Sequence, residues 1–480
     1  MQSRSSFVLA SIVAATSVPL AAQHLQLVPQ SRVLDLFVVD STFDGVWRLS
    51  DRDQDGLYAS SGEVNVYYDD LTGPVILTNP TSVGVGPKGE VYVTDSTTDQ
   101  VTLLLDTDGN GDALGPTEAV VFFDGVNNGS GVVALSMQSV TVDLFGNLFV
   151  VNASISGGGF DEIVRLRDLN GDFDANDFGE ADSYCRIPVG QTPLGDSVPT
   201  KVVVGHDLNL YYTDVSSTGV LQKGVYQIID LNNDGDANDP GEVRLYWSPT
   251  GAANAFYWGL AVDRIGNVYV TDHGNEQVWV GRDLDNSGVI DFAEERLFYQ
   301  TAASTWWDVI VHSDGSVYLC EDQTPDRITR LLDLNGDGDA LDPNESLEVY
   351  DSTVTVPAVR PRGAAFQTGA EMGFTPNPVR IGQVTTLSVR AWRPGDVAVL
   401  LLSDALSPQP IPLPPFGRLE VNPALLVVAA QLVADSQAGV SLPLTIPNQP
   451  ALVGSLAFQI LAGDISRQAL TNASVLIIQP

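Results

Sequence analysis

The sequence predicts an all-β protein, in which a six-bladed β-propeller is followed by a C-terminal Ig-like β-sandwich. The first observation is an acidic loop that recurs six times, with starts between 50 and 62 residues apart. The second is that each copy lies among short apolar strands in the same order. A repeat of this length that is built from strands is typical of propeller blades. The loops begin at Asp51, Asp106, Asp168, Asp230, Asp283 and Asp333.

Each repeat contains four strand-like segments, apart from the first, which contains three. In the fifth repeat they are "GLAV" from Gly259, "NVYVTD" from Asn267, "QVWVGR" from Gln277 and "ERLFYQ" from Glu295, with the acidic loop before the last. Their alternation of apolar and polar residues and the Gly- and Asp-rich turns between them indicate β-strands. Six such repeats predict a propeller over residues 32–368.

The first repeat lacks an innermost strand on its N-terminal side. "VRPRGAAFQ", which begins at Val359, has the pattern of that missing strand. We expect it to pair with "DLFVVD", residues 35–40, and so to close the ring. Closure removes the free sheet edges that otherwise promote aggregation.

Residues 369–480 differ in composition from the repeats. The acidic loops stop, and segments such as "VTTLSVRAW", "VAVLLLSD" and "SLAFQILA" are separated by Pro- and Gly-containing turns. Short alternating strands over about this length are typical of a β-sandwich. We therefore expect an Ig-like sandwich here.

The N-terminus has the features of a secretory signal peptide, predicted to span residues 1–22. Arg4 provides a basic region, an apolar run extends from Phe7 to Ala22, and a cleavage-type sequence ends at Gln23. No other apolar run approaches 18 residues, so we expect no membrane span. The mature protein is expected to be secreted, periplasmic or at the cell surface.

The charge balance restricts the partners. The chain has a formal net charge of −37, which argues against nucleic acid and anionic membranes and favours bound cations. Only two cysteines are present, Cys185 and Cys320. They fall in different predicted blades, so we expect two unpaired core residues.

The loop "DLDNSGVIDFAE" matches the pattern of an EF-hand calcium loop. Oxygen-bearing side chains stand at positions 1, 3, 5, 9 and 12, with Gly288 at position 6, where the backbone turns sharply. Calcium takes six to eight oxygen ligands, which this spacing directs inward. The ligand-type residues are Asp283, Asp285, Ser287, Asp291 and Glu294.

The other five loops keep this skeleton but place the final Glu at position 13. Four of them carry an Asp side chain at position 7, where Leu57 stands in the first loop. We interpret all six as structural Ca²⁺ sites; the alternative is a set of solvated Asp/Asn/Gly turns. Their candidate ligands are Asp51, Asp53, Asp55, Glu63, Asp106, Asp108, Asn110, Asp112, Glu118, Asp168, Asn170, Asp172, Asp174, Glu180, Asp230, Asn232, Asp234, Asp236, Glu242, Asp333, Asn335, Asp337, Asp339 and Glu345.

The motif "GNVYVTDHGNEQVWVGRD", residues 266–283, resembles NHL-type propellers and the streptogramin lyase and gluconolactonase-like families. The loops themselves resemble those of EF-hand and dockerin repeats. The resemblance implies the six-bladed fold, whereas its members include lyases, lactonases and binding modules. Gluconolactonase-like enzymes hold a central divalent metal with Glu, Asn and Asp, which Asn152, Asp214 and Asp272 could imitate.

A candidate ligand pocket is expected where second strands end and first strands begin. Tryptophans there could stack on a sugar, and Lys201 and Asp308 could form an ion pair or an acid/base couple. The alternative is that the acids cap turns and the aromatic residues belong to the core. The candidate residues are Asp95, Lys201, Asp214, Trp258, Asp272, His273, Trp307 and Asp308.

These observations favour a secreted calcium-binding propeller that acts as an extracellular binding or scaffold protein for a glycan or protein ligand. The alternative is a lyase or lactonase-type hydrolase with a divalent metal in its central pocket. Whether the protein is an enzyme stays open at this point. The chain has four histidines, of which only His273 is expected to face the pocket, so a three-histidine metal site cannot be assembled.

Overall fold

The computed structural model describes residues 35–479 with gaps, and the predicted signal peptide, residues 1–22, lies outside the described residues. No helix among the described residues is long and apolar enough to cross a membrane. The gaps are at 54, 87–88, 144, 154–160, 188–196, 206, 216–222, 233, 250–254, 264–265, 286, 302–304, 313–314, 323–324, 356, 368–370, 376–378, 382, 391–396, 404–405, 413–417, 422, 424–425, 434–438, 447–453, 464–467 and 471–473.

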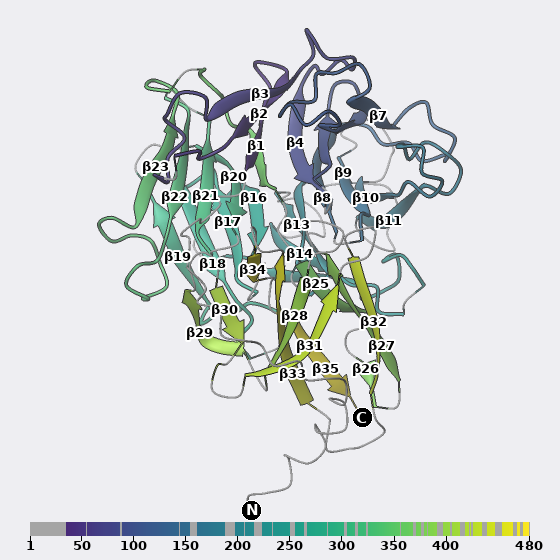
Figure 1. Ribbon diagram of the computed structural model, residues 1–480, viewed down its shortest axis with the longest axis vertical. Helices are drawn as coiled ribbons and strands as arrows, with labels where there is room; N and C mark the ends of the chain where they lie inside the picture. Colours follow the sequence, from purple (N-terminus) through teal and green to yellow (C-terminus); the bar gives the residue numbers. More distant parts are fainter. Residues whose placement is uncertain are drawn as a thin grey trace, which may run out of the picture. The chain divides into compact units, whose positions relative to one another are not determined.

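The chain forms two compact units, and the first, Val33–Gly369, is a six-bladed propeller (Figure 1). Each blade is a four-stranded antiparallel sheet. Blade 1 consists of β24 (Gly363–Phe366), β1 (Leu36–Asp40), β2 (Gly45–Leu49) and β3 (Val64–Asp69). Blade 2 consists of β4 (Pro80–Val85), β5 (Val91–Asp95), β6 (Gln100–Leu104) and β7 (Ala119–Asp124). Blade 3 consists of β8 (Met137–Val142), β9 (Leu148–Asn152), β10 (Asp161–Leu166) and β11 (Ala181–Ile187).

The other three blades have the same strand order. Blade 4 consists of β12 (Pro199–Val204), β13 (Leu210–Asp214), β14 (Gly224–Ile228) and β15 (Val243–Trp247). Blade 5 consists of β16 (Tyr257–Val262), β17 (Val268–Asp272), β18 (Gln277–Gly281) and β19 (Glu295–Gln300). Blade 6 consists of β20 (Trp306–Val311), β21 (Val317–Glu321), β22 (Arg327–Leu331) and β23 (Ser346–Asp351).

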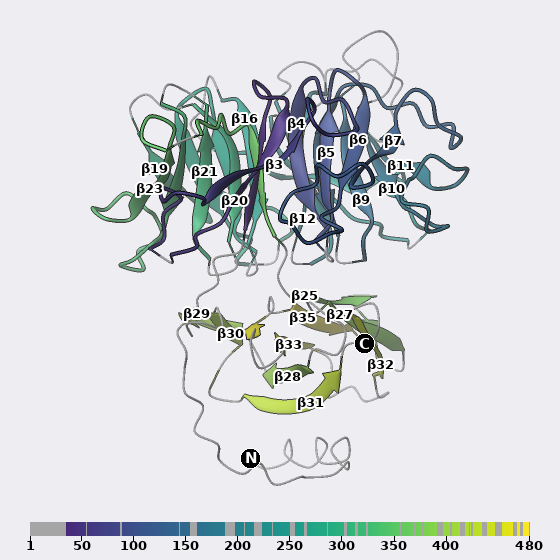
Figure 2. The same cartoon turned by 45° about the horizontal axis from the view of Figure 1, so that its top comes forward.

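The innermost strands form a closed ring, because β4, β8, β12, β16, β20 and β24 each contact the next and β24 contacts β4. Figure 2, which views the blades from the side, labels β4, β12, β16 and β20 of this ring. The ring closes as predicted from the sequence. Strand β24 pairs with β1, with Leu36 opposite Phe366 and Val39 opposite Gly363. The N- and C-terminal parts of the propeller thus share one blade, and β1 is paired on both sides, with β24 and with β2.

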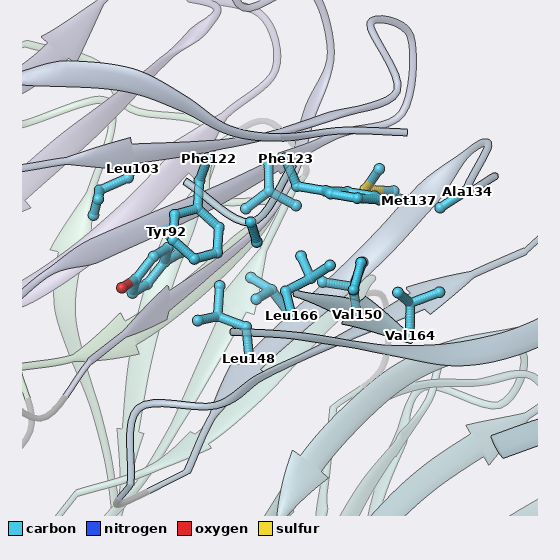
Figure 3. Packing of buried hydrophobic residues seen from close by; sticks show 14 residues of the cluster. Tyr92, Leu103, Phe122, Phe123, Ala134, Met137, Leu148, Val150, Val164 and Leu166 are labelled. Atoms are coloured by element: carbon cyan, nitrogen blue, oxygen red, sulfur yellow. The ribbon is translucent and has the colours of Figure 1, made fainter. Parts of the chain in front are cut away.

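Apolar clusters fill the spaces between neighbouring blades. Between blades 2 and 3, Tyr92 and Phe122 pack edge to face with centroids 5.1 Å apart, and Leu148 and Leu166 belong to the same cluster (Figure 3). The same pairing of a second-strand ring with a fourth-strand ring recurs in four other blades. These pairs are Phe37–Tyr67, Phe149–Tyr184, Tyr211–Tyr246 and Tyr269–Phe298. Cys185 and Cys320 are buried and free, as expected.

The second unit contains residues 370–480 and is also built from strands. A three-stranded sheet has the order β25 (Glu371–Thr375), β27 (Val384–Arg390), β32 (Gly439–Thr445). A larger sheet has the order β26 (Val379–Arg380), β35 (Ser474–Gln479), β33 (Gly454–Gly463), β28 (Val397–Ser403), β31 (Val427–Val433), and β34 (Gln468–Leu470) pairs with β33. Strands β29 (Leu406–Pro412) and β30 (Arg418–Val421) form a separate pair. The Ig-like sandwich stays a prediction.

Candidate functional site

Each acidic loop connects the third and fourth strands of a blade and is folded around its first Asp. We number each loop from that Asp as position 1. In every loop the position-1 carboxylate accepts the backbone N–H of position 6, at donor–acceptor distances of 2.8 to 3.1 Å. Position 6 has positive φ throughout and is Gly in five loops, whereas Phe173 stands there in blade 3 with φ 70°. The shared bond explains why the loops keep one shape.

The final Glu of each loop connects the beginning of the loop with its end through two backbone hydrogen bonds. Its Oε1 accepts the backbone N–H of position 2 at 2.6 to 2.9 Å. Its Oε2 accepts a backbone N–H three residues earlier at 2.9 to 3.2 Å. Both bonds form whether the Glu stands at position 12 or 13. The extra residue of the longer loops therefore lies between position 2 and the residue three places before the Glu.

Glu118 illustrates the electrostatics of this arrangement. Burial by itself raises the pKa of its carboxyl, but the N–H of Gly115, the hydroxyl and N–H of Thr107 and the N–H of Asp108 together lower the pKa below its usual value. Hydrogen bonds to a charged carboxylate favour the ionised form. The side chain is therefore held as an anion inside the loop.

Carboxylate oxygens converge within the loops in a way that fits a hard cation. In four loops, oxygens of three acidic residues lie within 4.8 Å of one another. Asp106 Oδ1 and Asp230 Oδ1 are buried without a hydrogen-bond partner among the described residues. A buried carboxylate oxygen without a donor is costly, and an oxygen-seeking divalent ion would satisfy it. The four groups are Asp51, Asp53 and Asp55; Asp106, Asp108 and Glu118; Asp172, Asp174 and Glu180; and Asp283, Asp285 and Glu294.

Sequence reasoning missed the acidic residue at position 10. In blades 3, 4 and 6 the Asn at position 3 donates its Nδ2 to Asp177, Asp239 or Asp342, at 2.9, 2.6 and 2.6 Å. The pKa of Asp342 is raised, first by desolvation and then by repulsion from Asp337 and Glu345. The recurrence of Asp at position 10 in three of the six loops was the available signal.

Each acidic loop also contacts the preceding blade. The position-8 residue is buried, and its backbone N–H donates to a carbonyl of the neighbouring outer strand at 2.7 to 2.8 Å. The six bonds run around the whole ring, including the seam between blades 6 and 1. Their donor–acceptor pairs are Tyr58–Val349, Ala113–Tyr67, Ala175–Phe122, Ala237–Tyr184, Ile290–Tyr246 and Ala340–Phe298.

Arginines of the preceding blade approach the same loops. Arg48 Nη1 donates to the carbonyl of Gly111 at 3.1 Å, and Arg296 Nη1 donates to that of Asp337 at 2.7 Å. Both carbonyls belong to loops of the next blade. The loops are thus part of the interface between blades as well as candidate metal sites.

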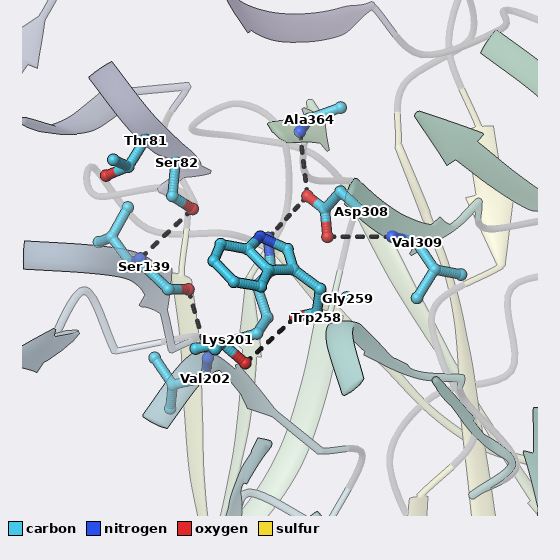
Figure 4. Close-up of polar contacts among 12 residues, drawn as sticks. Thr81, Ser82, Ser139, Lys201, Val202, Trp258, Gly259, Asp308, Val309 and Ala364 are labelled. Carbon is cyan, nitrogen blue, oxygen red and sulfur yellow. Dashed lines mark hydrogen bonds and ion pairs between the residues drawn. The ribbon is translucent and has the colours of Figure 1, made fainter. Parts of the chain in front are cut away.

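At the propeller axis, Lys201 and Asp308 form the ion pair that the sequence allowed, with Nζ and Oδ2 2.7 Å apart (Figure 4). The Asp308 side chain is 2% exposed and also accepts N–H groups from Ala364 and Val309. Burial raises the pKa of Asp308, and the Lys201 ammonium opposes that rise. The ion pair joins blades 4 and 6, and the bond from the Ala364 N–H adds blade 1.

The same level of the inner strands carries further bonds between blades. Ser82 Oγ accepts the N–H of Val140 at 3.4 Å, and Ser139 Oγ accepts that of Val202 at 3.3 Å (Figure 4). These contacts use the third residue of one inner strand and the fourth residue of the next. Asp308 occupies the equivalent place in blade 6 and bonds Ala364 of blade 1 in a similar way.

The structure brings three other predicted residues together in a half-buried aromatic cluster. The Trp258 and Trp307 rings are perpendicular with centroids 4.9 Å apart, and His273 lies 5.1 Å from Trp307. Arg362 stacks over Trp307 at 4.1 Å, and Phe256, which sequence reasoning missed, stacks on Trp258. Burial lowers the pKa of His273, while a backbone hydrogen bond with Trp306 opposes that change.

The remaining predicted pocket residues cap the ends of their own blades. Asp95 accepts four backbone N–H groups, two at each of its carboxylate oxygens. Asp214 accepts the hydroxyl of Ser197 at 2.6 Å and the N–H of Val198 at 3.3 Å. Asp272 accepts the N–H of Phe256 at 3.0 Å. All three carboxylates therefore join the second strand to the segment before the first strand.

No family model matches the chain, and no curated protein matches it. Solved structures with similar folds include a gluconolactonase from Xanthomonas campestris, with 12% identity, a TM-score of 0.40, and coverage of 75% of this chain and 96% of that one. A virginiamycin B lyase from Staphylococcus aureus has 14% identity, a TM-score of 0.39, and coverage of 76% and 94%. Regucalcin from Agrobacterium tumefaciens, a calcium-binding protein, has 10% identity, a TM-score of 0.36, and coverage of 56% and 75%.

Proposed function

We propose that the chain is an exported calcium-binding propeller that acts as an extracellular binding or scaffold protein. The observation that carries the calcium assignment is the buried, unpartnered Oδ1 of Asp106 beside Asp108 and Glu118. Its loop shares one hydrogen-bonding pattern with the other five. Calcium suits this set, because it accepts several carboxylate and carbonyl oxygens in a flexible shell.

The proposed role of calcium is to stabilise the ring. Position 8 of each loop bonds the preceding blade, so an ion that orders the loop also orders the contact between the two blades. Calcium that binds only the folded loop stabilises the fold by mass action. An exported protein would meet enough free calcium for this purpose.

The ligand is proposed to dock at the aromatic cluster near the axis. Trp258 and Trp307 are half-buried and offer aromatic surface that can stack on a sugar ring or on a protein side chain. Catalysis is less favoured, because Asp95, Asp214 and Asp272 are engaged in capping bonds. Among the described residues, every group of three potential metal ligands lies in an acidic loop.

Metal analysis of the purified mature protein, combined with calorimetry, tests this proposal. We expect several calcium ions per chain, one for each occupied loop, and a lower melting temperature after treatment with EGTA. An unchanged melting temperature would refute a structural role for calcium. One further ion that survives EGTA and exchanges for another divalent metal would instead support the alternative, a lyase or lactonase with an axial metal.

A further inference from the structure

The acidic loop of blade 3, residues 168–180, carries three large apolar side chains that are exposed to solvent. Leu169 is 63% exposed, Phe173 is 57% exposed and Phe178 is 91% exposed. Single exposed apolar residues are common on protein surfaces, whereas several in one place mark a surface on which partners dock. We call these three residues the rim patch.

Hydrogen bonds within the loop fix the backbone at all three positions. The Leu169 N–H is bonded to Glu180 Oε1 at 2.9 Å, and the N–H of the residue before Phe178 is bonded to Glu180 Oε2 at 3.2 Å. The Phe173 N–H is bonded to Asp168 Oδ2 at 3.1 Å. The rim patch is therefore ordered before a partner arrives, which lowers the entropic cost of binding.

The loop that carries the rim patch lies on the outside of the ring. The Ala175 N–H is bonded to the carbonyl of Phe122 at 2.7 Å, and the Asp124 N–H is bonded to Asn176 Oδ1 at 2.9 Å. Phe122 and Asp124 belong to β7, the outermost strand of blade 2. The rim patch is thus separate from the aromatic cluster and from the Lys201–Asp308 pair, which lie near the axis.

Both phenylalanines are departures from most of the other loops. Phe173 stands where the other five loops have Gly, although φ at this position is 70°. A side chain is costly in that conformation, and burial of the exposed ring does not offset the cost. Backbone strain that is retained in this way is typical of functional positions. At the place of Phe178, two residues before the final Glu, the other loops have Ser61, Pro116, Pro240, Phe292 and Pro343.

The charge around the rim patch favours a cationic partner. Residues 168–180 include five acidic residues and no Lys, Arg or His, so one bound Ca²⁺ leaves a formal charge of −3. Two exposed carboxylates, Asp172 and Asp177, directly precede Phe173 and Phe178. A Lys or Arg side chain of a partner can therefore contact an aromatic ring and a carboxylate together.

The same charge argues against two other occupants of the rim patch. A second copy of this chain has the same net charge of −37, so two copies repel each other. An anionic membrane is repelled for the same reason. A protein segment with both basic and apolar side chains complements the charge and the apolar surface.

We propose that the rim patch docks a basic amphipathic segment of another protein, in which apolar residues alternate with Lys or Arg. The apolar side chains of this segment cover Leu169, Phe173 and Phe178. Its basic side chains pair with Asp172 and Asp177. The propeller then has a docking surface on its outer rim in addition to the aromatic cluster near its axis.

Fluorescence anisotropy on the calcium-loaded mature protein tests the proposal with a labelled amphipathic Leu/Lys peptide as the probe. A Ser/Lys peptide keeps the charge of the probe, and a Leu/Glu peptide keeps its apolar residues. We expect the Leu/Lys peptide to bind at least about tenfold more tightly than either. Equal affinity for the Leu/Lys and Ser/Lys peptides would show attraction to the net charge alone and overturns the proposal.

The repeat itself supplies the decisive variant. Phe173→Gly combined with Phe178→Ser introduces the residues that blade 1 has as Gly56 and Ser61, so the loop fold already tolerates both, and the charge is unchanged. We expect at least about a tenfold loss of affinity for the Leu/Lys peptide with an unchanged or higher melting temperature. Leu71→Ser, which removes an 87% exposed side chain between blades 1 and 2, is the matched control. Peptide affinity that the double variant retains, or that the control reduces equally, contradicts the proposal.

Two further measurements distinguish the other occupants. We expect no self-association in sedimentation velocity that depends on Phe173 and Phe178, and no flotation with phosphatidylcholine vesicles. Self-association that the double variant abolishes would identify a second copy as the occupant and overturn the proposal. Flotation that the double variant abolishes would do the same in favour of a lipid surface.

Discussion

At the scale of single residues, the six loops allow the same position to be compared in six surroundings. Position 6 has positive φ in each, a conformation that favours glycine over residues with a Cβ. Phe173 is the exception, with φ 70° and an exposed ring. We expect Phe173→Gly to raise the free energy of unfolding by about 1 kcal/mol, because strain at this backbone conformation is relieved.

Urea denaturation of the calcium-loaded protein measures this effect. The matched control is Gly235→Ala in blade 4, where no neighbouring atom lies within 4 Å of the place that a Cβ would take, so that only the backbone conformation is affected. It should lower the free energy of unfolding by about 1 kcal/mol. A destabilised Phe173→Gly variant would show that the phenyl ring makes a stabilising contact that outweighs the strain.

The Lys201–Asp308 ion pair allows the stabilities of a single and a double variant to be compared. Lys201→Met leaves the buried Asp308 carboxylate without its counter-ion, which we expect to cost about 3–5 kcal/mol near neutral pH. A further Asp308→Leu substitution should recover most of that loss, because it removes the unpaired charge. A double variant no more stable than the single one would show that the bonds from Ala364 and Val309 matter more than the ion pair.

The pH dependence of Lys201→Met follows from the same pair. Burial raises the pKa of Asp308 above its ordinary value of 3.8, and loss of Lys201 raises it further. A carboxyl with a raised folded-state pKa favours folding at low pH, and this contribution is lost as pH rises through that pKa. The melting-temperature deficit relative to wild type should therefore be smaller at about pH 4 than at about pH 8. A deficit that is constant with pH would contradict this assignment.

At the scale of elements, the acidic loops are junctions between blades. Ala175, at position 8 of the third loop, is fully buried, and its N–H bonds the carbonyl of Phe122 in blade 2. We expect Ala175→Leu to destabilise the propeller by about 1–3 kcal/mol, because the seam has no room for the added atoms. Ala293→Leu, at an exposed position of the fifth loop, should have almost no effect. Equal effects of the two variants in urea denaturation would show that the seam is loosely packed.

At the scale of the whole molecule, the repeat explains what the sequence could predict. The recurrent strands and the closing segment from Val359 could be recognised, because the alternation and spacing of strand residues are visible within a single repeat. Bonds between repeats, such as Tyr58 to Val349, leave no local pattern and were missed. The acidic spacing suggested cation ligands, but it did not show that Glu118 and its counterparts also anchor the loops through backbone N–H groups.

The closing strand provides the last prediction at this scale. A chain ended after Gln367 keeps β24 and the bond from the Gln367 N–H to the carbonyl of Asp35, whereas a chain ended after Arg360 loses both. The shorter chain exposes the edge of β1 and removes the Ala364 N–H from Asp308. We expect the longer truncation product to retain a cooperative, EGTA-sensitive melting transition and the shorter one to aggregate or melt at a much lower temperature. Similar transitions for both products would show that β24 is dispensable for ring closure.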